Sequence, residues 1–462
     1  MRMNKTLQII KDKLFYGLAD YTKNQPDLFI PHRFRLIAPS QARRFLDDFR
    51  QSLVEEEVLL YVHLPFCFSE CLFCNSFPHT TNKELQQEYL RGLLREIDLF
   101  CDAGLFVGKT AKCIYLGGGT PTSFSNESIS LILKKIKARI DVSGNCNTTC
   151  EAHPATLSDE SRIEELADIG INRISIGCQT FDSAVLKRCN RSHTEAQIRT
   201  IVAAAKNAGI ATNIDMMTGL PGQTLEGVRR DLDVLADIGP DAIEYIRHEV
   251  VNPLVISLYR ENPDLVVDDE TLFEMVYLTQ DWMEHHGYEQ NGRFSNKDQW
   301  EYRYHWLKEM PIIAFGSRAR SYAKTMCFDK HEDLSMYLLS IRKGIPPAVR
   351  YIALTRKEQM YRSLFLNLQT RMGLDIEQFQ HRFNEDPRKT FAHLVATLGQ
   401  YGCLTVDESS MRLSCYGSYF VEDVCDHIID AALKEESDDL VRAPHSTGRT
   451  SDRLYGNAGS EV

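Results

Sequence analysis

Three closely spaced cysteines have the residue type and the spacing to hold a metal centre. Cys67, Cys71 and Cys74 follow the pattern C-x3-C-x2-C, directly after an apolar run that predicts a buried strand. Thiolates are the ligands that iron–sulfur clusters prefer, and three ligands on a four-iron cluster would leave one iron open to a small molecule. Random placement of 13 cysteines among 462 residues would give such a triad only about 0.01 times.

Zinc is the alternative occupant of this triad. A structural zinc site requires a fourth ligand, and His63 and His79 lie near enough in the sequence to supply it. A second pair, Cys146 and Cys150, has the spacing C-x3-C, which chance alone gives about 0.4 times in this chain. We expect both of these cysteines to lie along one strand and to be structural.

Glycines and polar residues recur at or just after the ends of predicted strands. Acidic side chains there are costly to bury without a partner, and a cationic ligand would supply one. A glycine run lets a ligand approach the backbone, and an arginine suits a carboxylate. Each residue alone would be interpreted as a turn, a cap or a surface group, but their recurrence in order favours a binding site. They are Gly117, Gly118, Gly119, Thr120, Glu151, Gln179, Arg191 and Asp215.

The elements that must position these residues alternate between apolar strands and amphipathic helices. The strand-forming segments are 58–66, 113–116, 147–151, 172–179, 211–224 and 241–250. The helical segments are 82–101, 125–140, 158–169, 194–208 and 225–238. This repeat predicts an α/β fold, a partial (β/α)6 TIM-like barrel over residues 58–260, with its active site beyond the carboxyl ends of the strands.

The flanking regions have other patterns. Residues 1–57 predict an N-terminal arm of short helices, and residues 261–350 predict an α+β extension that completes the active site. Residues 351–433 are mostly helical, with a hairpin over 402–417 that turns near Asp407–Ser410, and they predict a winged-helix-like domain. Residues 434–462 are polar and rich in Ser, Gly and charge, so we expect a disordered tail.

Composition narrows the class of protein. A net charge of −11 lacks the basic balance of nucleic-acid binders, so we expect no nucleic acid as a partner. No run approaches the roughly 20 apolar residues that span a bilayer, and the first residues do not resemble a signal peptide. We therefore expect a cytoplasmic protein without a membrane span, a monomer that acts on a small molecule. In a reducing compartment the 13 cysteines are not expected to form disulfides.

The triad, its leading segment YVHLPFC and the later motifs resemble the radical SAM superfamily. More narrowly, they resemble the oxygen-independent coproporphyrinogen III oxidase-like group, which includes a heme chaperone and the class C radical SAM methylases. The clear motifs run from residue 61 to 223, and a weaker likeness continues to about residue 430. The resemblance implies a [4Fe–4S] cluster on Cys67, Cys71 and Cys74 as the catalytic centre. It also implies S-adenosylmethionine (SAM), in one or two copies, and a flavodoxin or ferredoxin as the reductant.

The resemblance also implies roles for the residues at the strand ends. The segment Gly117–Gly119 with Thr120 would contact the methionyl amino group of SAM. Glu151 and Asp215 would meet the amino group or the ribose.

Four further residues complete the site that the resemblance implies. Gln179 would serve the ribose or its surroundings, and Arg191 would clamp the SAM carboxylate. Tyr61 and Phe73 would lie around the cluster and the adenine, where simple packing is also their ordinary role.

The expected reaction is reductive cleavage of SAM to a 5′-deoxyadenosyl radical, which removes hydrogen from a porphyrin-type or natural-product substrate. The authentic oxidase has a further cysteine where this chain has Ser76, and residues 31–39 match its N-terminal segment poorly. Two alternatives therefore stay open: a C-methyltransferase with a second SAM, and a heme chaperone for which His79 is a candidate ligand. Arg318 and Arg320 could grip substrate carboxylates or could be solvated.

Overall fold

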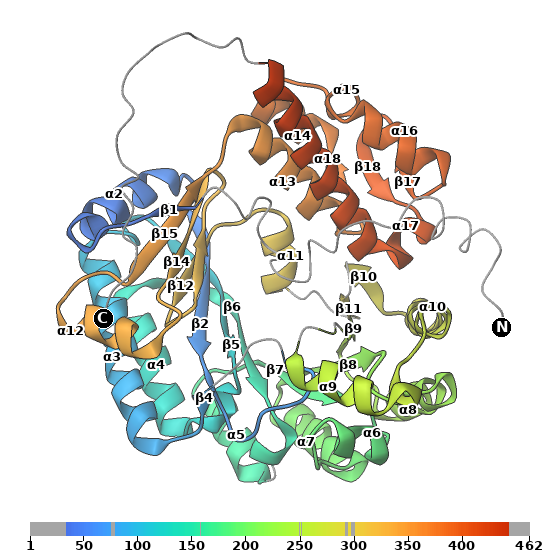
Figure 1. Ribbon diagram of the computed structural model, residues 1–462. Coiled ribbons are helices and arrows are strands. Elements are labelled where there is room, and N and C mark those ends of the chain that lie inside the picture. The colour runs from blue at the N-terminus through green and yellow to red at the C-terminus, as the bar shows by residue number, and fades with distance from the viewer. Residues whose placement is uncertain are drawn as a thin grey trace, which may run out of the picture.

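The computed structural model describes residues 34–74, 79–157, 159–248, 250, 252–291, 294–296 and 301–442. Its centre is a row of six adjacent parallel strands, so the predicted partial (β/α)6 barrel is confirmed (Figure 1). The strands are β2 (Glu57–Leu64), β5 (Thr110–Gly118), β6 (Asp141–Ala152), β7 (Arg173–Gln179), β8 (Ala211–Thr218) and β9 (Ala242–Arg247).

Side chains alternate between the two faces of each strand, as the pleat of a β-strand requires. In β2, Val58, Leu60 and Val62 join the large hydrophobic cluster beneath the helices, whereas Leu59 and Tyr61 face the other way. Cys150 of β6 is buried in the helix-side cluster and Cys146, in the same strand, packs against it. Both cysteines therefore lie along one strand and belong to the core, as expected.

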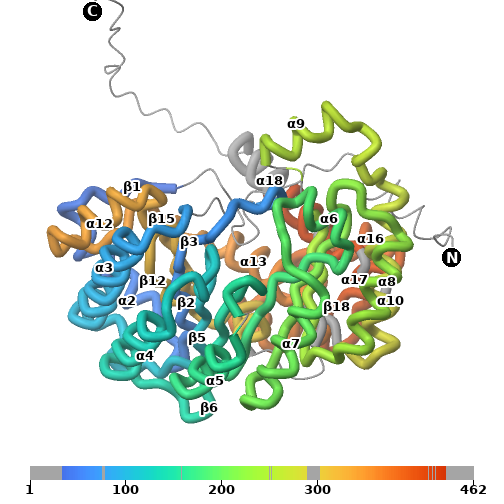
Figure 2. The backbone as a smooth tube through the Cα atoms, turned by 90° about the horizontal axis from the view of Figure 1, so that it is seen from below, coloured from blue at the N-terminus to red at the C-terminus, as the bar shows by residue number. Residues whose placement is uncertain are grey.

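The outer face of the curved sheet is covered by helices (Figure 2). They are α3 (Lys83–Asp102), α4 (Asn126–Arg139), α5 (Glu160–Asp168), α6 (Ser183–Arg188), α7 (Glu195–Asn207) and α8 (Leu225–Ile238). Most start at a residue whose side chain accepts a backbone N–H, as Asn82 does before α3 and Ser125 before α4. The predicted helices are therefore present, and α6 is an additional short one.

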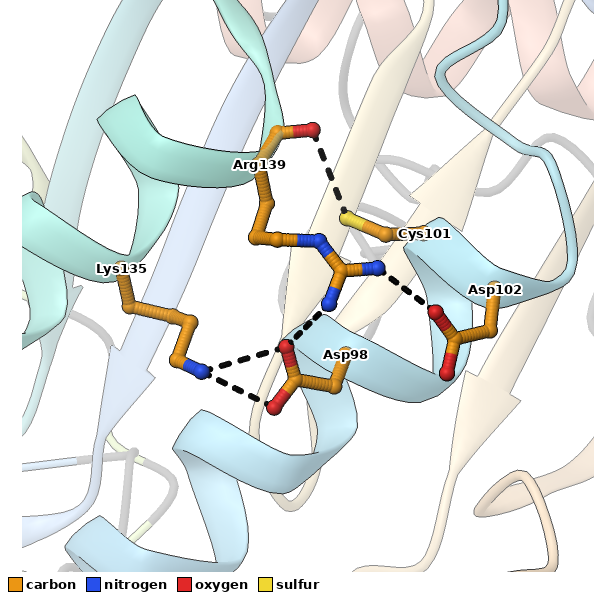
Figure 3. A network of polar contacts seen from close by, with 5 residues as sticks. All are labelled: Asp98, Cys101, Asp102, Lys135 and Arg139. Atoms are coloured by element: carbon orange, nitrogen blue, oxygen red, sulfur yellow. Dashed lines mark hydrogen bonds and ion pairs between the residues drawn. The ribbon is translucent and has the colours of Figure 1, made fainter.

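Charged side chains join α3 to α4 at the rim of this layer (Figure 3). Asp98 accepts from Lys135 Nζ at 2.9 Å and from Arg139 Nη1 at 2.6 Å, and Arg139 also reaches Asp102. These groups are partly solvated, so each pair is worth only about 0–1 kcal/mol. They orient the two helices, while the apolar cluster beneath supplies most of the stability.

The region expected as a separate α+β extension continues the same sheet. β12 (Ile312–Phe315) pairs parallel with β2, and the strands beyond it are antiparallel. These are β13 (Arg320–Tyr322), β14 (Met326–Lys330), β15 (Ala348–Ala353) and β1 (Arg35–Leu36), with α2 (Ala42–Ser52) and α12 (Leu334–Arg342) nearby. At the other edge the sheet ends in β11 (Phe294–Asn296) and β10 (Glu289–Asn291), after α9 (Pro253–Glu261) and α10 (Asp269–His285).

The C-terminal region contains helices and a small three-stranded sheet. Its elements are α13 (Arg356–Leu368), β16 (Leu374–Asp375), α14 (Ile376–Phe383), α15 (Pro387–Thr390), α16 (Ala392–Gln400), β17 (Leu404–Val406), β18 (Ser410–Leu413), α17 (Cys415–Tyr419) and α18 (Val421–Arg442). The predicted hairpin is β17–β18, and Asp407 N–H donates to Ser410 O in its turn. Helix α18 continues to Arg442, so the expectation of disorder from residue 434 is wrong for 434–442.

A second hydrophobic cluster joins this region to the barrel. It contains Leu59 and Cys113 from the inner face of the sheet together with Leu364 and Phe365 of α13. The C-terminal region therefore covers part of the open side of the barrel, next to α11 (Glu301–Leu307) (Figures 1 and 2).

Two sequence expectations fall outside the described part of the chain. Residues 1–33, which form most of the expected N-terminal arm, and Ser76 are not described, nor are residues 443–462 of the expected tail. Within the described residues, no helix has the length and apolar character needed to cross a membrane.

Candidate functional site

The loop that carries the three cysteines begins where β2 ends, at the carboxyl edge of the barrel. It passes through β3 (Phe66–Cys67), which pairs with β4 (His79–Thr80). Two asparagine side chains from other loops hold it: Asn190 Nδ2 donates to Glu70 O at 2.8 Å, and Asn252 Nδ2 donates to Cys74 O at 3.4 Å. The loop is therefore anchored to the segments after β7 and β9.

The cysteine side chains lie against two of the predicted binding segments. All three are half-buried. Cys67 Sγ lies 3.1 Å from Thr120 Oγ1, and Arg191 Nη1 donates to Cys71 Sγ at 3.3 Å. Burial raises the pKa of the Cys67 thiol to about 11, so binding of iron there must displace a proton.

The residues around the triad fit an iron–sulfur cluster with SAM beside it. Among the described residues no three His, Cys, Asp or Glu side chains converge closely enough to hold a single metal ion. A cluster does not require that, because each thiolate binds a different iron. Two buried polar atoms of the predicted SAM residues, Gln179 Oε1 and Arg191 Nε, have no hydrogen-bond partner in the described part of the protein, and a bound ligand would satisfy them.

The glycine run at the end of β5 has a packing role that the sequence did not reveal. Gly118 has φ of 111°, and a Cβ there would lie 2.4 Å from His63 Nδ1. Its N–H donates to Glu151 Oε2 at 3.0 Å, and Gly119 N–H donates to Leu64 O at 3.0 Å. These two N–H groups thus bind the protein itself, and the absence of side chains lets β5 approach the start of the cysteine loop.

Glu151 lies where its strand ends, as predicted, and two donors hold it. Tyr115 O–H donates a hydrogen bond to Glu151 Oε1 at 2.8 Å, and Gly118 N–H donates one to Glu151 Oε2 at 3.0 Å. Burial raises the pKa of Glu151 to about 7, against the lowering effect of these two hydrogen bonds. The carboxylate is therefore poised to accept a cationic group such as an ammonium.

Gln179 and Arg191 lie close together beside Gly177 of β7. Gln179 ends β7 with φ of 75°, a backbone conformation that non-glycine residues rarely adopt outside functional sites. Arg191 Nη2 donates to Gly177 O, 14 residues earlier in the chain, while Nη1 donates to Cys71 Sγ. Both side chains are more than nine-tenths buried. The structure thus brings these two predicted residues together with the triad.

Asp215 is not at the end of its strand, which is a correction to the sequence analysis. It lies inside the barrel, three positions before Thr218, the last residue of β8. Ser175 Oγ donates to it at 3.0 Å, and Asn213 Nδ2 also donates to it. Burial and the nearby carboxylate of Glu244 raise its pKa well above the usual range. Asp215 therefore lies on the inner face of the barrel, in register with Gly177 of β7, and lines the same cavity as Glu151.

Tyr61 and Phe73 lie on different sides of the site. Tyr61 faces the inside of the barrel, where its O–H pairs with His63 Nδ1 at 3.0 Å and its ring stacks 6.1 Å from that of Tyr115. Phe73 packs against a small apolar cluster that contains Leu220. Burial, with Arg318 and Lys330 adding to it, lowers the pKa of His63 to about 3, so this ring is neutral.

A cavity of about 610 Å³ opens beside these residues. Carboxylates of Glu151, Asp215 and Glu244 line its barrel side, and Arg318, Arg320 and Arg350 line the side formed by the added strands. Its volume is in the range of cavities that hold drug-sized ligands. The barrel side of the cavity thus carries carboxylates, and the side of the added strands carries arginines together with Asp329 and Glu332.

Three residues of the site were missed by the sequence analysis. They are Tyr115, Glu244 and Asn252, of which the first two line the cavity and the third holds the cysteine loop. The alternation within the strands could have revealed two of them. Glu244 is paired in register with Asp215, and Tyr115 with Tyr61. Asn252 gave no signal, because its contact depends on the position of a loop 178 residues away in the chain.

Comparisons with known proteins agree with this geometry. Residues 61–235 match the radical SAM superfamily, and residues 354–420 match the HemN C-terminal domain. The heme chaperone HemW of Haemophilus influenzae is 34% identical over 235 residues, which is 50% of this chain and 60% of that protein. The anaerobilin synthase of Escherichia coli O157:H7 is 25% identical over 391 residues, 83% of this chain and 86% of that protein.

A solved structure shows the same fold over most of the chain. Coproporphyrinogen III oxidase (HemN) from Escherichia coli, described as a radical SAM enzyme, superposes with a TM-score of 0.73 at 24% identity. The match covers 83% of this chain and 93% of that one. Residues 61–235 therefore carry a radical SAM domain, whose cofactors are a [4Fe–4S] cluster and SAM, residues 354–420 carry a HemN C-terminal domain, and the fold of the chain is that of the HemN structure.

Proposed function

We propose that this protein is a radical SAM enzyme that acts on a tetrapyrrole-type or related organic substrate. The observation that carries the proposal is the contact between the triad and the predicted SAM residues. The Arg191 guanidinium donates a hydrogen bond to Cys71 Sγ. The hydroxyl of Thr120 lies 3.1 Å from Cys67 Sγ. A SAM molecule held by the segments of Arg191 and Thr120 would therefore adjoin the cluster. The cavity that Glu151 lines supplies room for a substrate.

The chain's own residues would each supply part of the reaction. When bound, a [4Fe–4S] cluster supplies the electron that splits SAM into methionine and a 5′-deoxyadenosyl radical. Cys67, Cys71 and Cys74 would bind three of its irons. Glu151 would hold the amino group of SAM, and Arg191 its carboxylate, which orients the reacting bond.

Shielding of a radical from water is the task of the surrounding structure. The C-terminal region packs on the open side of the barrel through the cluster that contains Leu59 and Phe365. Arg247 Nη1 of β9 lies 3.4 Å from Asp423 Oδ2 of α18 and joins the two parts at the surface. These contacts support the interpretation of the C-terminal region as a cover for the site.

Heme binding is the second candidate function, because a curated relative is named as a heme chaperone. The cavity would suit either activity, since a basic wall can meet the carboxylates of heme or of another tetrapyrrole. His79 pairs with the cysteine loop through β4 and also lines a smaller cavity of about 330 Å³ between α3 and α12. It does not line the larger cavity.

The deciding experiment is anaerobic incubation of the reconstituted protein with SAM and dithionite. Mass spectrometry would follow 5′-deoxyadenosine and S-adenosylhomocysteine. We expect 5′-deoxyadenosine from the wild type and none from Cys71→Ala. Cys101→Ala is the matched control, because Cys101 is a half-buried cysteine on α3 that contacts only Arg139 O in Figure 3 and should leave cleavage unchanged.

Each product pattern has a separate meaning. S-adenosylhomocysteine together with 5′-deoxyadenosine would assign methyl transfer with a second SAM. Absence of both products from protein with a full cluster would contradict the enzyme and favour the chaperone. In that case a heme titration should give one tight site with a characteristic absorption band.

A further inference from the structure

The pairing between the parallel strands β2 and β12 stops before β2 ends. The last residues in register are Val62 of β2 and Phe315 of β12, although β2 continues to Leu64. On its other side, β2 stays paired with β5 as far as Leu64. The early stop therefore concerns only the side of β2 that faces the added strands.

The hydrogen bond that would come next in this ladder can be named. Leu59 N–H donates to Pro311 O, and the bonds of a parallel pair recur every two residues along each strand. His63 is four residues after Leu59 and therefore occupies the equivalent position two steps further on. A regular continuation would have Ser317 N–H donate to His63 O.

A tyrosine hydroxyl takes the place of that bond. Tyr89 O–H, from α3, donates to His63 O at 2.7 Å and accepts from Ser317 N–H at 3.1 Å. The two backbone groups are thus linked through an intervening oxygen, so both are satisfied while the strands are held apart. Tyr89 is completely buried, and burial raises its pKa well above the ordinary value, so the neutral hydroxyl can both donate and accept.

The surrounding residues leave room for the hydroxyl and hold it there. The Tyr89 ring lies edge-on to that of Phe66, with the centroids 5.6 Å apart. Gly316 has φ of 103°, and a Cβ there would lie 2.4 Å from the Tyr89 hydroxyl oxygen and 2.6 Å from His63 O. Gly316 N–H points to Glu96 Oε2, at 2.7 Å, and not to β2. The opening between the strands is therefore formed by a phenol on one side and a missing side chain on the other.

The larger cavity lies where the two strands separate. His63, one residue beyond the last paired position of β2, lines it, and so do Arg318 and Ala319, just beyond the end of β12. A direct bond between Ser317 and His63 would draw these two parts of the lining together. The distance between β2 and the loop 316–318 thus contributes to the width of the cavity.

His63 also connects this opening to the predicted SAM residues. Its ring lies against Gly118, where a Cβ would be 2.4 Å from His63 Nδ1. Gly118 N–H in turn donates to Glu151 Oε2 at 3.0 Å. In the other direction along the chain, Cys67 follows His63 by four residues. A shift of the His63 backbone would therefore reach both Glu151 and the cysteine loop.

We propose that Tyr89 is a positioning residue whose hydroxyl holds β2 and β12 apart at the carboxyl edge of the barrel. It thereby sets the width of the cavity and the position of the cysteine loop relative to Glu151. The proposal rests on the proposed function for the roles of the cavity and of Glu151. The separation of the strands by the hydroxyl does not depend on that function.

The variant Tyr89→Phe removes the hydroxyl and keeps the ring. Crystals of the full-length, cluster-reconstituted protein, grown without oxygen, would compare it with the wild type. In the variant we expect Ser317 N–H to donate directly to His63 O, at about 2.9 Å, and the cavity to be smaller. If these two groups stay as far apart as in the wild type, with or without a water molecule between them, the proposal is overturned.

The affinity for SAM tests the consequence for the site. Calorimetric titration of the cluster-loaded protein should show about fivefold weaker binding in Tyr89→Phe, because the change reaches Glu151 only through other residues. Tyr288→Phe is the matched control. Tyr288 is also buried, and its hydroxyl donates to Pro240 O at 2.9 Å, before the start of β9 and thus at the opposite edge of the barrel.

The control separates positioning from a general loss of stability. Thermal unfolding should show that each variant is folded, since each loses one buried hydroxyl and keeps its aromatic ring. Tyr288→Phe should bind SAM as the wild type does. Equal SAM affinity in Tyr89→Phe and Tyr288→Phe would overturn the positioning role of Tyr89.

The same preparations keep this proposal separate from the proposed function. Cleavage of SAM by the wild type is measured alongside. Its absence would contradict the radical SAM activity, whereas the comparison of the two crystal structures decides whether Tyr89 holds the strands apart.

Discussion

Glu151 is the residue of the site whose charge is most sensitive near neutral pH. Burial raises its pKa to about 7, so the carboxyl is protonated as the pH falls below that value. A protonated carboxyl cannot balance an ammonium group. If Glu151 holds the amino group of SAM, affinity should fall about tenfold from pH 7 to pH 5.5.

Calorimetric titration of SAM over this range would measure the change. Glu151→Gln should bind SAM more weakly at pH 7 and lose the dependence on pH. His153 and His193 have pKa values lowered to about 3 by burial, so their rings stay neutral throughout this window. If SAM affinity still depends on pH in Glu151→Gln, another group is responsible for the pH dependence.

Gly118 should not tolerate a side chain. Gly118→Ala places a methyl against the His63 ring in a left-handed backbone, and we expect a loss of more than about 1 kcal/mol in the free energy of unfolding. Gly108→Ala is the matched control, because it has φ of 68° but no atom within 4 Å of the added Cβ. Urea unfolding of both variants separates the effect of the steric clash from that of backbone strain. Equal losses of the free energy of unfolding in the two variants would show that the contact with His63 makes no contribution.

At the scale of elements, the start of α7 positions the predicted SAM-carboxylate residue. Thr194 and Gln197 form a reciprocal cap there, three residues after Arg191. Thr194→Ala should lower the free energy of unfolding by about 1 kcal/mol. It should also weaken SAM binding, because the segment that carries Arg191 loses its anchor.

Thr224→Ala provides the comparison for this cap. The Thr224 side chain also caps its helix by accepting from Gly227 N–H, without the reciprocal bond of the α7 cap, and α8 does not follow Arg191. Chemical denaturation should show a similar loss of stability in both variants. Equal SAM affinity in the two would argue against a role for the α7 cap in the site.

The buried pair Glu96–Lys330 joins α3 to β14. Removal of one partner leaves an uncompensated buried charge, so Glu96→Gln should cost about 3–5 kcal/mol of stability. The double variant Glu96→Gln with Lys330→Met should recover part of that loss. A double-mutant cycle by urea unfolding measures the coupling, and additive losses would show that the two groups act independently.

For the whole molecule, the C-terminal region and the barrel share one hydrophobic cluster. Leu59 and Cys113 of the barrel pack with α13, and the Phe273 ring of α10 lies 4.9 Å from that of Phe420. A chain that ends at residue 353 would expose this apolar surface. We expect it to be insoluble or to bind a hydrophobic dye, as measured by sedimentation and dye fluorescence. A soluble truncated barrel with native circular dichroism would contradict this interdependence.

Much of the fold could be predicted because its signals are local. The apolar run before the triad, the alternation of strands with capped helices, and the turn at Asp407–Ser410 each depend on neighbours in sequence. The same is true of the cysteine spacing, whose chemistry is carried by twelve consecutive residues, 63–74. The sequence therefore determined the superfamily, the parallel barrel and the cluster ligands proposed here.

Only the tertiary structure decided how the distant parts meet. It placed Asp215 within β8 and not at its end, because the length of β8 is set by its pairing with β7 and β9. It also paired Glu244 with Asp215, and it brought Arg320 and Asp329 together in the wall of the cavity. These facts depend on register and on contacts between residues far apart in the chain. Local residue preferences do not encode such contacts, because their energies arise only when the sheet has assembled.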